Sequence, residues 1–277
     1  MKRSGYPGKA APIIPILLFL VTSLPAHAQV MNGSFETGDF TGWTTTGFTA
    51  IEQDTTAPTA DGNFASFEIH PTSGNFEVLA ATDFFGVSNP VSPTALETFL
   101  GLNSGSLNAI ASAAIAGDVV DDGSAFKQTL VVTSTSRLSF DWNFLTNETL
   151  APINNDYGFY TLGSMVTELA DAQNSLFFAV PGGIDAPYVA ETGWSTVSMT
   201  LAPGTYTLGF GAVNINDNTV SSGLLVDNVT LTGVASTTPE PGAVALFAGM
   251  AATGLWVLAL RRRARRGNDR RFATELI

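Results

Sequence analysis

Carboxylates are the most abundant ionisable side chains in this chain, whereas histidine and cysteine are scarce. Between Gln29 and Pro241 there are twenty-two Asp and Glu residues. The chain has no cysteine, and its two histidines are His27 and His70. A zinc hydrolase needs several histidine or cysteine ligands, and a cysteine nucleophile needs a thiol, so the sequence excludes both classes of enzyme.

Motifs for serine and phosphate chemistry are also missing. A Ser-His-Asp triad would have to use His70, in the segment FEIHPTS, and no Gly-x-Ser-x-Gly nucleophile elbow is present. The segment FGAVNINDN contains no lysine and is not a phosphate-binding loop. Twenty-two acids always offer some pair for glycoside cleavage, but no spacing singles one out. We therefore expect a non-catalytic protein, with a polysaccharide-active hydrolase as the less favoured alternative.

The densest group of oxygen donors lies between Asp141 and Asp156. Asp, Asn and Glu residues alternate there with apolar residues and then crowd the loop that follows. Calcium takes about six to eight such oxygen ligands, so Glu148 and Asp156 are a candidate cation pair. The alternative is a loop whose polar side chains bond only to their own backbone.

The charge balance excludes some partners. The only bases between residues 29 and 241 are Lys127 and Arg137, so this region has a formal charge of −20. A surface of this kind repels nucleic acid and anionic lipid, so we expect no nucleic-acid partner. Without disulfides, the region between residues 29 and 241 must rely on its core, or on a metal, for stability.

The first residues have the parts of a secretory signal peptide. A positively charged start is followed by an apolar run over residues 13–24. Ala26 and Ala28 then occupy the two positions that signal peptidase reads. We therefore expect residues 1–28 to be removed and the protein to be exported.

The other end of the chain predicts a transmembrane helix. Residues 242–260 contain no charge, and a helix of that length spans about 28 Å, close to the ~30 Å hydrocarbon core of a bilayer. The basic tail at 261–277 follows directly, and the positive-inside rule keeps it in the cytoplasm. The residues that stop transfer are Arg261, Arg262, Arg263, Arg265 and Arg266.

Between these ends the chain predicts an all-β sandwich. In STVSMTL, Val197, Met199 and Leu201 alternate with polar residues, and in LAPGTYTLGFGAV a Pro-Gly turn precedes a second alternating run. Many short strands separated by turn residues indicate a β-sandwich. The predicted strands cover residues 64–69, 76–81, 124–132, 137–145, 157–162, 175–180, 194–201, 205–213 and 223–231.

One segment, residues 92–117, lacks the period of a strand and predicts a helical insertion. Thr94 and Glu97 have capping-box spacing, which predicts one short helix over 95–100 that ends at Gly101. A second turn or short helix is expected over residues 107–111.

Five aromatic residues are candidates for stacking on sugar rings: Trp43, Trp194, Tyr157, Tyr160 and Tyr188. Each of them is more often a core residue than a binding platform. Tyr188 lies in a predicted loop, in GGIDAPYVAETGW, so we expect it to be the most exposed of the five. The sequence names no ligand site among them.

The tail resembles the PEP-CTERM sorting signal, which consists of Pro-Glu-Pro, a single transmembrane helix and clustered arginines. Here Pro239, Glu240 and Pro241 stand directly before the predicted span. In that family the signal implies recognition by exosortase, a membrane enzyme of Gram-negative bacteria that make exopolysaccharide, and removal of the tail. The resemblance therefore implies an inner-membrane intermediate and delivery to the cell surface or matrix. An ordinary single-pass anchor is the alternative.

The remaining region is similar to galactose-binding-like jelly rolls, which include several carbohydrate-binding modules. The similar segments are VMNGSFETGDFTGWTTTG near the start and LLVDNVTL near the end. In those domains a Glu of the first segment and an Asp of the last strand bind a structural calcium. The resemblance implies that Glu36 and Asp227 are the calcium ligands here, with Asn32 or Gly38 nearby. The alternative is that both acids are turn or cap residues.

Taken together, these features predict a jelly-roll-like β-sandwich at 29–234 with one short helical insertion. A linker at 235–241 joins it to the membrane span. We expect a non-catalytic surface or matrix protein associated with exopolysaccharide or adhesion, as a calcium-stabilised glycan binder. A purely structural matrix protein is the alternative.

Overall fold

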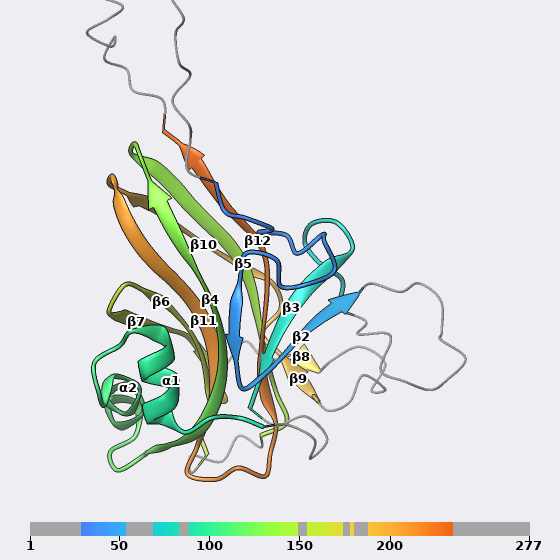
Figure 1. Ribbon diagram of the computed structural model, residues 1–277. Coiled ribbons are helices and arrows are strands. Elements are labelled where there is room, and N and C mark those ends of the chain that lie inside the picture. Colours follow the sequence, from blue (N-terminus) through green and yellow to red (C-terminus); the bar gives the residue numbers. More distant parts are fainter. Residues whose placement is uncertain are drawn as a thin grey trace, which may run out of the picture.

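The computed structural model describes residues 29–53, 69–82, 89–148, 154–173, 178–179 and 188–234. Within these residues two antiparallel sheets pack face to face, and two short helices lie against one of them (Figure 1). The predicted β-sandwich is therefore confirmed.

The predicted signal peptide, the sorting motif, the membrane span and the arginines all lie outside the described residues. No helix within the described residues is long and apolar enough to cross a membrane. The predicted strand at 64–69 is described only at Ile69, which is not in a strand.

The first sheet, sheet A, has five strands in the order β1-β4-β11-β6-β7. Its central strand, β11, pairs with β4 on one side and β6 on the other, and all pairs are antiparallel. The strands are β1 (Thr44–Thr46), β4 (Val120–Val132), β11 (Gly204–Ile215), β6 (Tyr157–Leu162) and β7 (Met165–Asp171).

The second sheet, sheet B, has seven strands in the order β2-β3-β12-β5-β9-β8, with β10 also paired to β5. Because β9 pairs with one end of β5 and β10 with the other, β5 has two neighbours along the same edge. The strands are β2 (Phe48–Gln53), β3 (Phe76–Ala81), β12 (Ser222–Gly233), β5 (Ser136–Thr146), β9 (Ala190–Glu191), β8 (Phe178–Ala179) and β10 (Ser195–Leu201).

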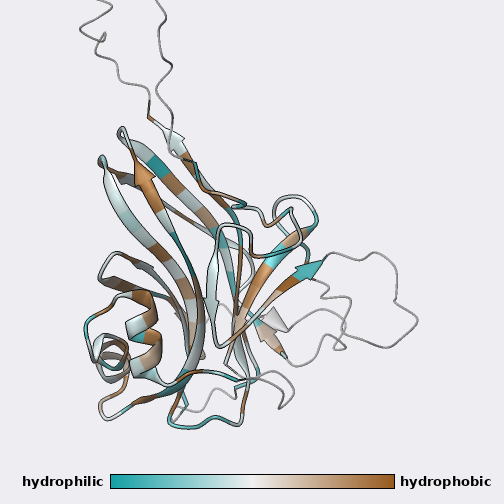
Figure 2. Cartoon of the chain, viewed as in Figure 1, coloured by the Kyte–Doolittle hydropathy of each residue, from teal (hydrophilic) through white to brown (hydrophobic). Residues whose placement is uncertain are grey.

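Residue alternation places the core between the two sheets. The long strands are banded in Figure 2, with hydrophobic and hydrophilic residues in turn. On β10, Val197, Met199 and Leu201 face the core, and the intervening Ser and Thr residues are exposed, as predicted. The predicted apolar face of β11 also packs in this core, where the rings of Phe140 and Phe210 lie 4.8 Å apart.

The segment over 92–117 forms two helices, α1 (Pro93–Leu100) and α2 (Ser106–Ala114), and α2 includes the second turn or short helix expected over residues 107–111. They cover part of the outer face of sheet A (Figure 1). Close approach is allowed by glycine, since a Cβ at Gly209 on β11 would lie 2.6 Å from Leu100 Cδ2. As predicted, α1 ends at Gly101, which has a φ of 75°.

The predicted capping box at Thr94 is wrong. Ser92 is the N-cap of α1, and Pro93 occupies the first turn, where its missing N–H costs nothing. Glu97 accepts hydrogen bonds from the N–H groups of Gly105 and Leu107 at 2.9 Å each. Glu97 therefore caps the start of α2, whose own N-cap residue is a glycine without a side chain.

Candidate ligand-binding face

Two buried carboxylates on adjacent strands of sheet B bind the segment that crosses its outer face, residues 69–76. Asp141 on β5 pairs in register with Asp227 on β12. The Thr72 hydroxyl oxygen lies 2.9 Å from Asp141 Oδ2 and 3.0 Å from Asp227 Oδ2. The N–H of Ser73 donates to Asp227 Oδ2 at 2.7 Å. Burial raises the pKa of the Asp227 carboxyl to about 6, although these hydrogen bonds work in the opposite direction.

Glu36 binds the same segment from the opposite end of the sequence. Its Oε1 accepts hydrogen bonds from the N–H groups of Asn75 at 2.8 Å and Phe76 at 3.0 Å. Gly74 has a φ of 76°, and a Cβ there would lie 2.1 Å from Glu36 Cδ, so this approach requires glycine. The two acids that the jelly-roll resemblance singles out, Glu36 and Asp227, thus converge on one segment.

The contacts of these two acids do not have the arrangement of a calcium site. Oxygens of Glu36 and Asp227 face N–H and O–H donors, whose positive ends would repel a cation, whereas calcium needs converging acceptors. Among the described residues, no group of three or more His, Cys, Asp or Glu could hold a metal ion. Calcium at these residues stays a prediction. In the described contacts, the carboxylates of Glu36 and Asp227 accept hydrogen bonds.

The second predicted cation pair, Glu148 and Asp156, interacts electrostatically with Asp217. Asp156 is buried, and its carboxylate accepts hydrogen bonds from the N–H of Ile215 at 2.8 Å and the hydroxyl of Ser222 at 2.7 Å. Burial raises the pKa of Asp156 well above its ordinary value, and burial with the Asp217 charge raises that of Glu148 to about 7. A cation site here also stays a prediction.

Most of the aromatic candidates are core residues. Trp43 and Tyr157 are buried, and Tyr160 is half-buried against the core between the sheets. Tyr188 is only 3% exposed, so the prediction that it is the most exposed is wrong. The Tyr188 side chain fits against Gly223 on β12, because a Cβ at position 223 would lie 2.6 Å from the Tyr188 hydroxyl oxygen.

Three adjacent strands of sheet B carry outward polar side chains, of which Asp141 and Asp227 lie beneath the segment at residues 69–76 and the others beyond it. The registers of β10 and β12 against β5 align their outward side chains in three rows. Rows lie about 7 Å apart along the strands, and neighbours within a row about 5 Å apart. We call these nine residues the polar face; row by row they are Thr200, Arg137 and Thr232; Ser198, Ser139 and Thr230; Thr196, Asp141 and Asp227.

A β-bulge in β12 allows both Asp227 and Thr230 to point to the polar face. The register shifts between Asp227 and Thr230, so two residues lie opposite one residue of β5. In a regular strand, positions 227 and 230 would point to opposite sides of the sheet. Asn228 holds the bulge with a φ of 51° and donates from Nδ2 to Asp141 Oδ2 at 3.0 Å.

Several side chains of the polar face are free to bind a ligand. Thr200, Thr230 and Thr232 are exposed, and their hydroxyls make no hydrogen bond within the described residues. The exposed Arg137 donates from Nε to Ser198 Oγ at 2.5 Å, which leaves its terminal N–H groups for a ligand. Hydroxyls and a guanidinium on a flat surface suit a ligand rich in hydroxyl groups.

A half-buried aromatic ring borders the third row. Trp194 lies two residues before Thr196, so alternation directs both side chains to the same face of sheet B. The Trp194 indole N–H donates to the carbonyl oxygen of His70 at 3.0 Å, which fixes the ring beside the segment at residues 69–76. Of the five aromatic candidates, Trp194 is therefore the one placed beside a polar surface.

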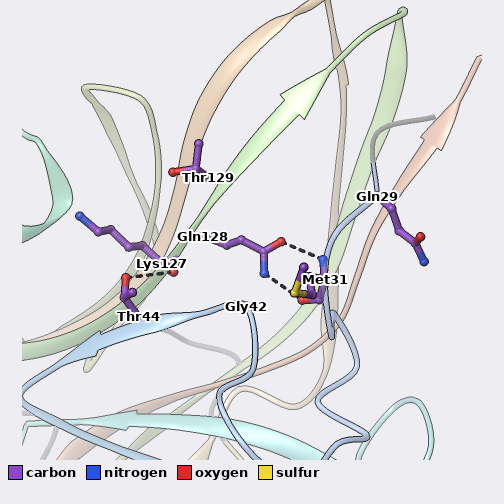
Figure 3. A pocket seen from close by; sticks show the side chains of 7 residues that line it. All are labelled: Gln29, Met31, Gly42, Thr44, Lys127, Gln128 and Thr129. Carbon is purple, nitrogen blue, oxygen red and sulfur yellow. Dashed lines mark hydrogen bonds between the residues drawn. The ribbon is translucent and has the colours of Figure 1, made fainter. Parts of the chain in front are cut away.

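A surface pocket of about 350 Å³ lies between the first turn of the chain and β4 (Figure 3). Its most polar side chains already have partners. Gln128 exchanges two hydrogen bonds with the backbone of Met31, and the Lys127 ammonium donates to the carbonyl oxygen of Phe99 while lying 4.4 Å from that ring's centroid. The pocket thus offers a ligand fewer free polar groups than the polar face does. It is lined by Gln29, Met31, Gly42, Thr44, Lys127, Gln128 and Thr129.

The sequence analysis missed the polar face as a site, although a signal for it exists. The segments RLSFDW and STVSMTL each alternate polar and apolar residues, which predicts one polar face per strand. What the sequence lacks is the pairing of β5 with β10 and β12. Without that pairing, the three polar strips cannot be joined into one surface.

No protein-family model matches the chain, and no curated protein matches it either. TmCBM61 in complex with beta-1,4-galactotriose is 10% identical over 73% of this chain and 96% of that one, with a TM-score of 0.33. The family 11 carbohydrate-binding module from Clostridium thermocellum, in complex with a beta-1,3-1,4-mixed-linked tetrasaccharide, is 10% identical over 76% of this chain and 99% of that one, with a TM-score of 0.29. The enzymatically active domain of tailspike protein 4 of bacteriophage CBA120 is 11% identical over 74% of this chain but 21% of that one, with a TM-score of 0.30. Similarity at this level assigns no ligand to this chain.

We predict that Glu36 stabilises the fold as an acceptor of N–H bonds. Glu36→Ala should lower the free energy of unfolding by about 1 kcal/mol, or the Tm by roughly 2–4 °C, because two amides lose a charged acceptor. Glu36→Gln keeps one acceptor oxygen and should retain most of the stability. Thermal melts with calcium and with chelator provide the check. A chelator-dependent Tm in the wild type that both variants abolish would instead establish calcium at Glu36.

We predict that the domain loses stability as the pH rises from 5 to 8. Burial raises the folded-state pKa of Asp156, of Asp227 to about 6 and of Glu148 to about 7. Each group therefore binds its proton more tightly in the folded than in the unfolded chain. That contribution is complete below the ordinary pKa of about 4 and is lost as the pH passes through the raised values. Tm measured against pH should fall over this range, and Asp227→Asn should make the fall shallower; a rising Tm would contradict the assignment.

Proposed function

We propose that this chain is an exported, non-catalytic β-sandwich protein of the cell surface or extracellular matrix that binds a polysaccharide on the polar face of sheet B. The observation that supports the binding role is the alignment of polar side chains in rows on three paired strands, with the first two rows uncovered and Trp194 beside the third. Polysaccharides present rows of hydroxyls along a chain and apolar patches on their ring faces. Rows of hydroxyls and an aromatic ring complement both features.

Rigidity of the polar face favours this role. β5 is paired on both sides, with β12 and β10, and the inner residues of all three strands pack in the core between the sheets. The outward side chains are thus held at fixed spacings before any ligand binds. A preorganised surface loses little conformational entropy on binding, which matters when each contact is a single exposed hydrogen bond.

The proposed location rests on the two ends of the chain. The expected removal of residues 1–28 exports the domain, and Pro239, Glu240 and Pro241 with the following span direct it to exosortase for processing. Release from the membrane would bring the domain to the cell surface or matrix, where it can meet exopolysaccharide. The formal charge of −20 between residues 29 and 241 keeps such a domain soluble and apart from anionic surfaces.

We predict that two substitutions on the polar face abolish most of the polysaccharide binding. Thr200→Leu with Thr230→Leu removes two exposed hydroxyls, at about 1 kcal/mol for each lost hydrogen bond, and should weaken binding roughly 10- to 30-fold. The measurement is co-sedimentation of the full chain, in mild detergent, with exopolysaccharide from the producing cells.

Two other Thr→Leu variants serve as controls for this experiment. Thr205→Leu makes the same change at an exposed position of sheet A and should bind as the wild type does. Thr129→Leu changes the pocket of Figure 3. Loss of binding in Thr129→Leu alone would move the site to the pocket. No binding by the wild type would favour the structural matrix role over a glycan binder.

We predict that the sorting motif is needed for release from the membrane. Replacing Pro239, Glu240 and Pro241 by alanine should leave the uncleaved chain in the membrane fraction, because the processing enzyme loses its recognition sequence. Fractionation followed by immunoblotting measures this. Thr237→Ala with Thr238→Ala, in the same linker, is the matched control and should be released normally. Equal release of both variants would contradict sorting by this motif.

A further inference from the structure

Arg137 is the only charged side chain exposed on the polar face. It lies in the first row, between Thr200 of β10 and Thr232 of β12, which are its register partners on either side. The two acids of the third row are 8% and 0% exposed and lie beneath the segment at residues 69–76. A ligand on this face therefore meets one positive group and no exposed negative group.

The Arg137 guanidinium is held in place but keeps most of its donors. Its Nε donates to Ser198 Oγ at 2.5 Å, and the Ser198 hydroxyl donates in turn to the carbonyl oxygen of Leu138 at 3.4 Å. The N–H groups on its two terminal nitrogens have no acceptor within the described residues, and the unbonded hydroxyls of Thr200 and Thr232 flank them. A planar pair of N–H donors fits the two oxygens of a carboxylate, and a flanking hydroxyl can donate to the same group.

The second row complements the hydroxyls of a neutral sugar. Ser139 Oγ and Ser198 Oγ donate their protons to carbonyl oxygens of the sheet at 3.1 Å and 3.4 Å, so they present lone pairs outward. The hydroxyl of Thr230 completes this row and is free to donate or accept. The first row thus offers donors that include a cation, and the second row offers mainly acceptors. This division suits a polymer in which an acidic sugar lies next to a neutral one.

The strand segments that carry these two rows contain no acid. Residues 123–140, 192–216 and 228–239 include no Asp or Glu, and they include Lys127 and Arg137, the two bases between residues 29 and 241. The nearest acids on the three strands are those of the third row, about 14 Å from Arg137 along the strands. Because that distance exceeds the Debye length of ~8 Å at physiological ionic strength, Arg137 dominates the local field. The formal charge of −20 of the whole region still opposes a polymer that is charged at every sugar.

We propose that the polysaccharide bound by the polar face carries carboxylate groups, spaced among neutral sugars, and that Arg137 selects them. This inference rests on the proposed function and names the chemical class of its ligand. A carboxylate forms two parallel charge-assisted hydrogen bonds with a guanidinium, each stronger than a bond between neutral groups. An ammonium group would be repelled by Arg137, and a wholly neutral glycan would leave the charge of the guanidinium unpaired.

The test uses exopolysaccharide from the producing cells before and after chemical reduction of its carboxylates to alcohols. The reduction removes the charge and keeps the length and linkages of the polymer. Co-sedimentation with the full chain, in mild detergent, should give a dissociation constant about 5- to 10-fold higher for the reduced polymer. Equal or tighter binding of the reduced polymer, or binding of a native polymer that contains no carboxylate, would overturn the carboxylate assignment and leave glycan binding intact. Absence of binding to both forms would overturn the proposed function as well.

Substitutions at Arg137 test whether this residue recognises the carboxylate. Arg137→Gln should weaken binding of the native polymer about 5- to 10-fold and change binding of the reduced polymer by less than about twofold, because both changes remove the same ion pair. Arg137→Lys keeps the charge but loses the planar pair of donors, so its affinity should fall in between.

The matched control for these variants is Lys127→Gln. It removes the same charge on sheet A, where Lys127 bonds to the carbonyl oxygen of Phe99, and should bind both polymers as the wild type does. An equal loss of affinity for both polymers in Arg137→Gln, with an unchanged Tm, would indicate a hydrogen bond to a neutral sugar and contradict the proposal.

Discussion

Hydrogen bonds from main-chain N–H groups to carboxylates hold the start and end of this sandwich together. The chain has no disulfide, and its described region has too few bases for ion pairs to do so. Glu36 from the first turn and Asp227 from the last strand bind opposite halves of one segment at residues 69–76. The first turn also approaches the last strand directly, where the Val229 N–H donates to the Gly33 carbonyl oxygen at 2.8 Å. The same bonds fix the edge of the polar face.

This way of neutralising acids has a consequence for the electrostatics. An amide N–H stabilises a carboxylate through its dipole but leaves the net charge of the molecule unchanged. A lysine or arginine in an ion pair would instead cancel the negative charge of the carboxylate. Asp141 and Asp156 are likewise bound by hydroxyl, amide and main-chain donors. The domain therefore keeps a strong negative field although its acids are individually well bound. The same carboxylates thus stabilise the fold and give the domain its net negative charge.

Local sequence patterns anticipated much of the fold but little of the site. Runs of apolar and β-branched residues located the strands at 76–81 and 157–162 to the residue, because both faces of each strand are largely buried. The same signal is weak in β1 and β7, which are edge strands with mostly exposed or half-buried residues, and both were missed. The polar face depends on which strands pair, on the bulge at Asn228 and on the cover over Asp227. All of these arise from residues far apart in the sequence. The burial of Tyr188 likewise depends on Gly223, which no local pattern connects to it.

The positions of β11 and β12 set the order in which this molecule can assemble. β11 is the centre of sheet A, between β4 and β6, and β12 joins β3 to β5 in sheet B. Both strands come from the last thirty-one residues that the structure describes, 204–234. A nascent chain that stops before Gly204 therefore lacks the strand that joins β4 to β6 and the strand that joins β3 to β5. Folding must wait for the end of the domain and then close long loops, which makes it slow.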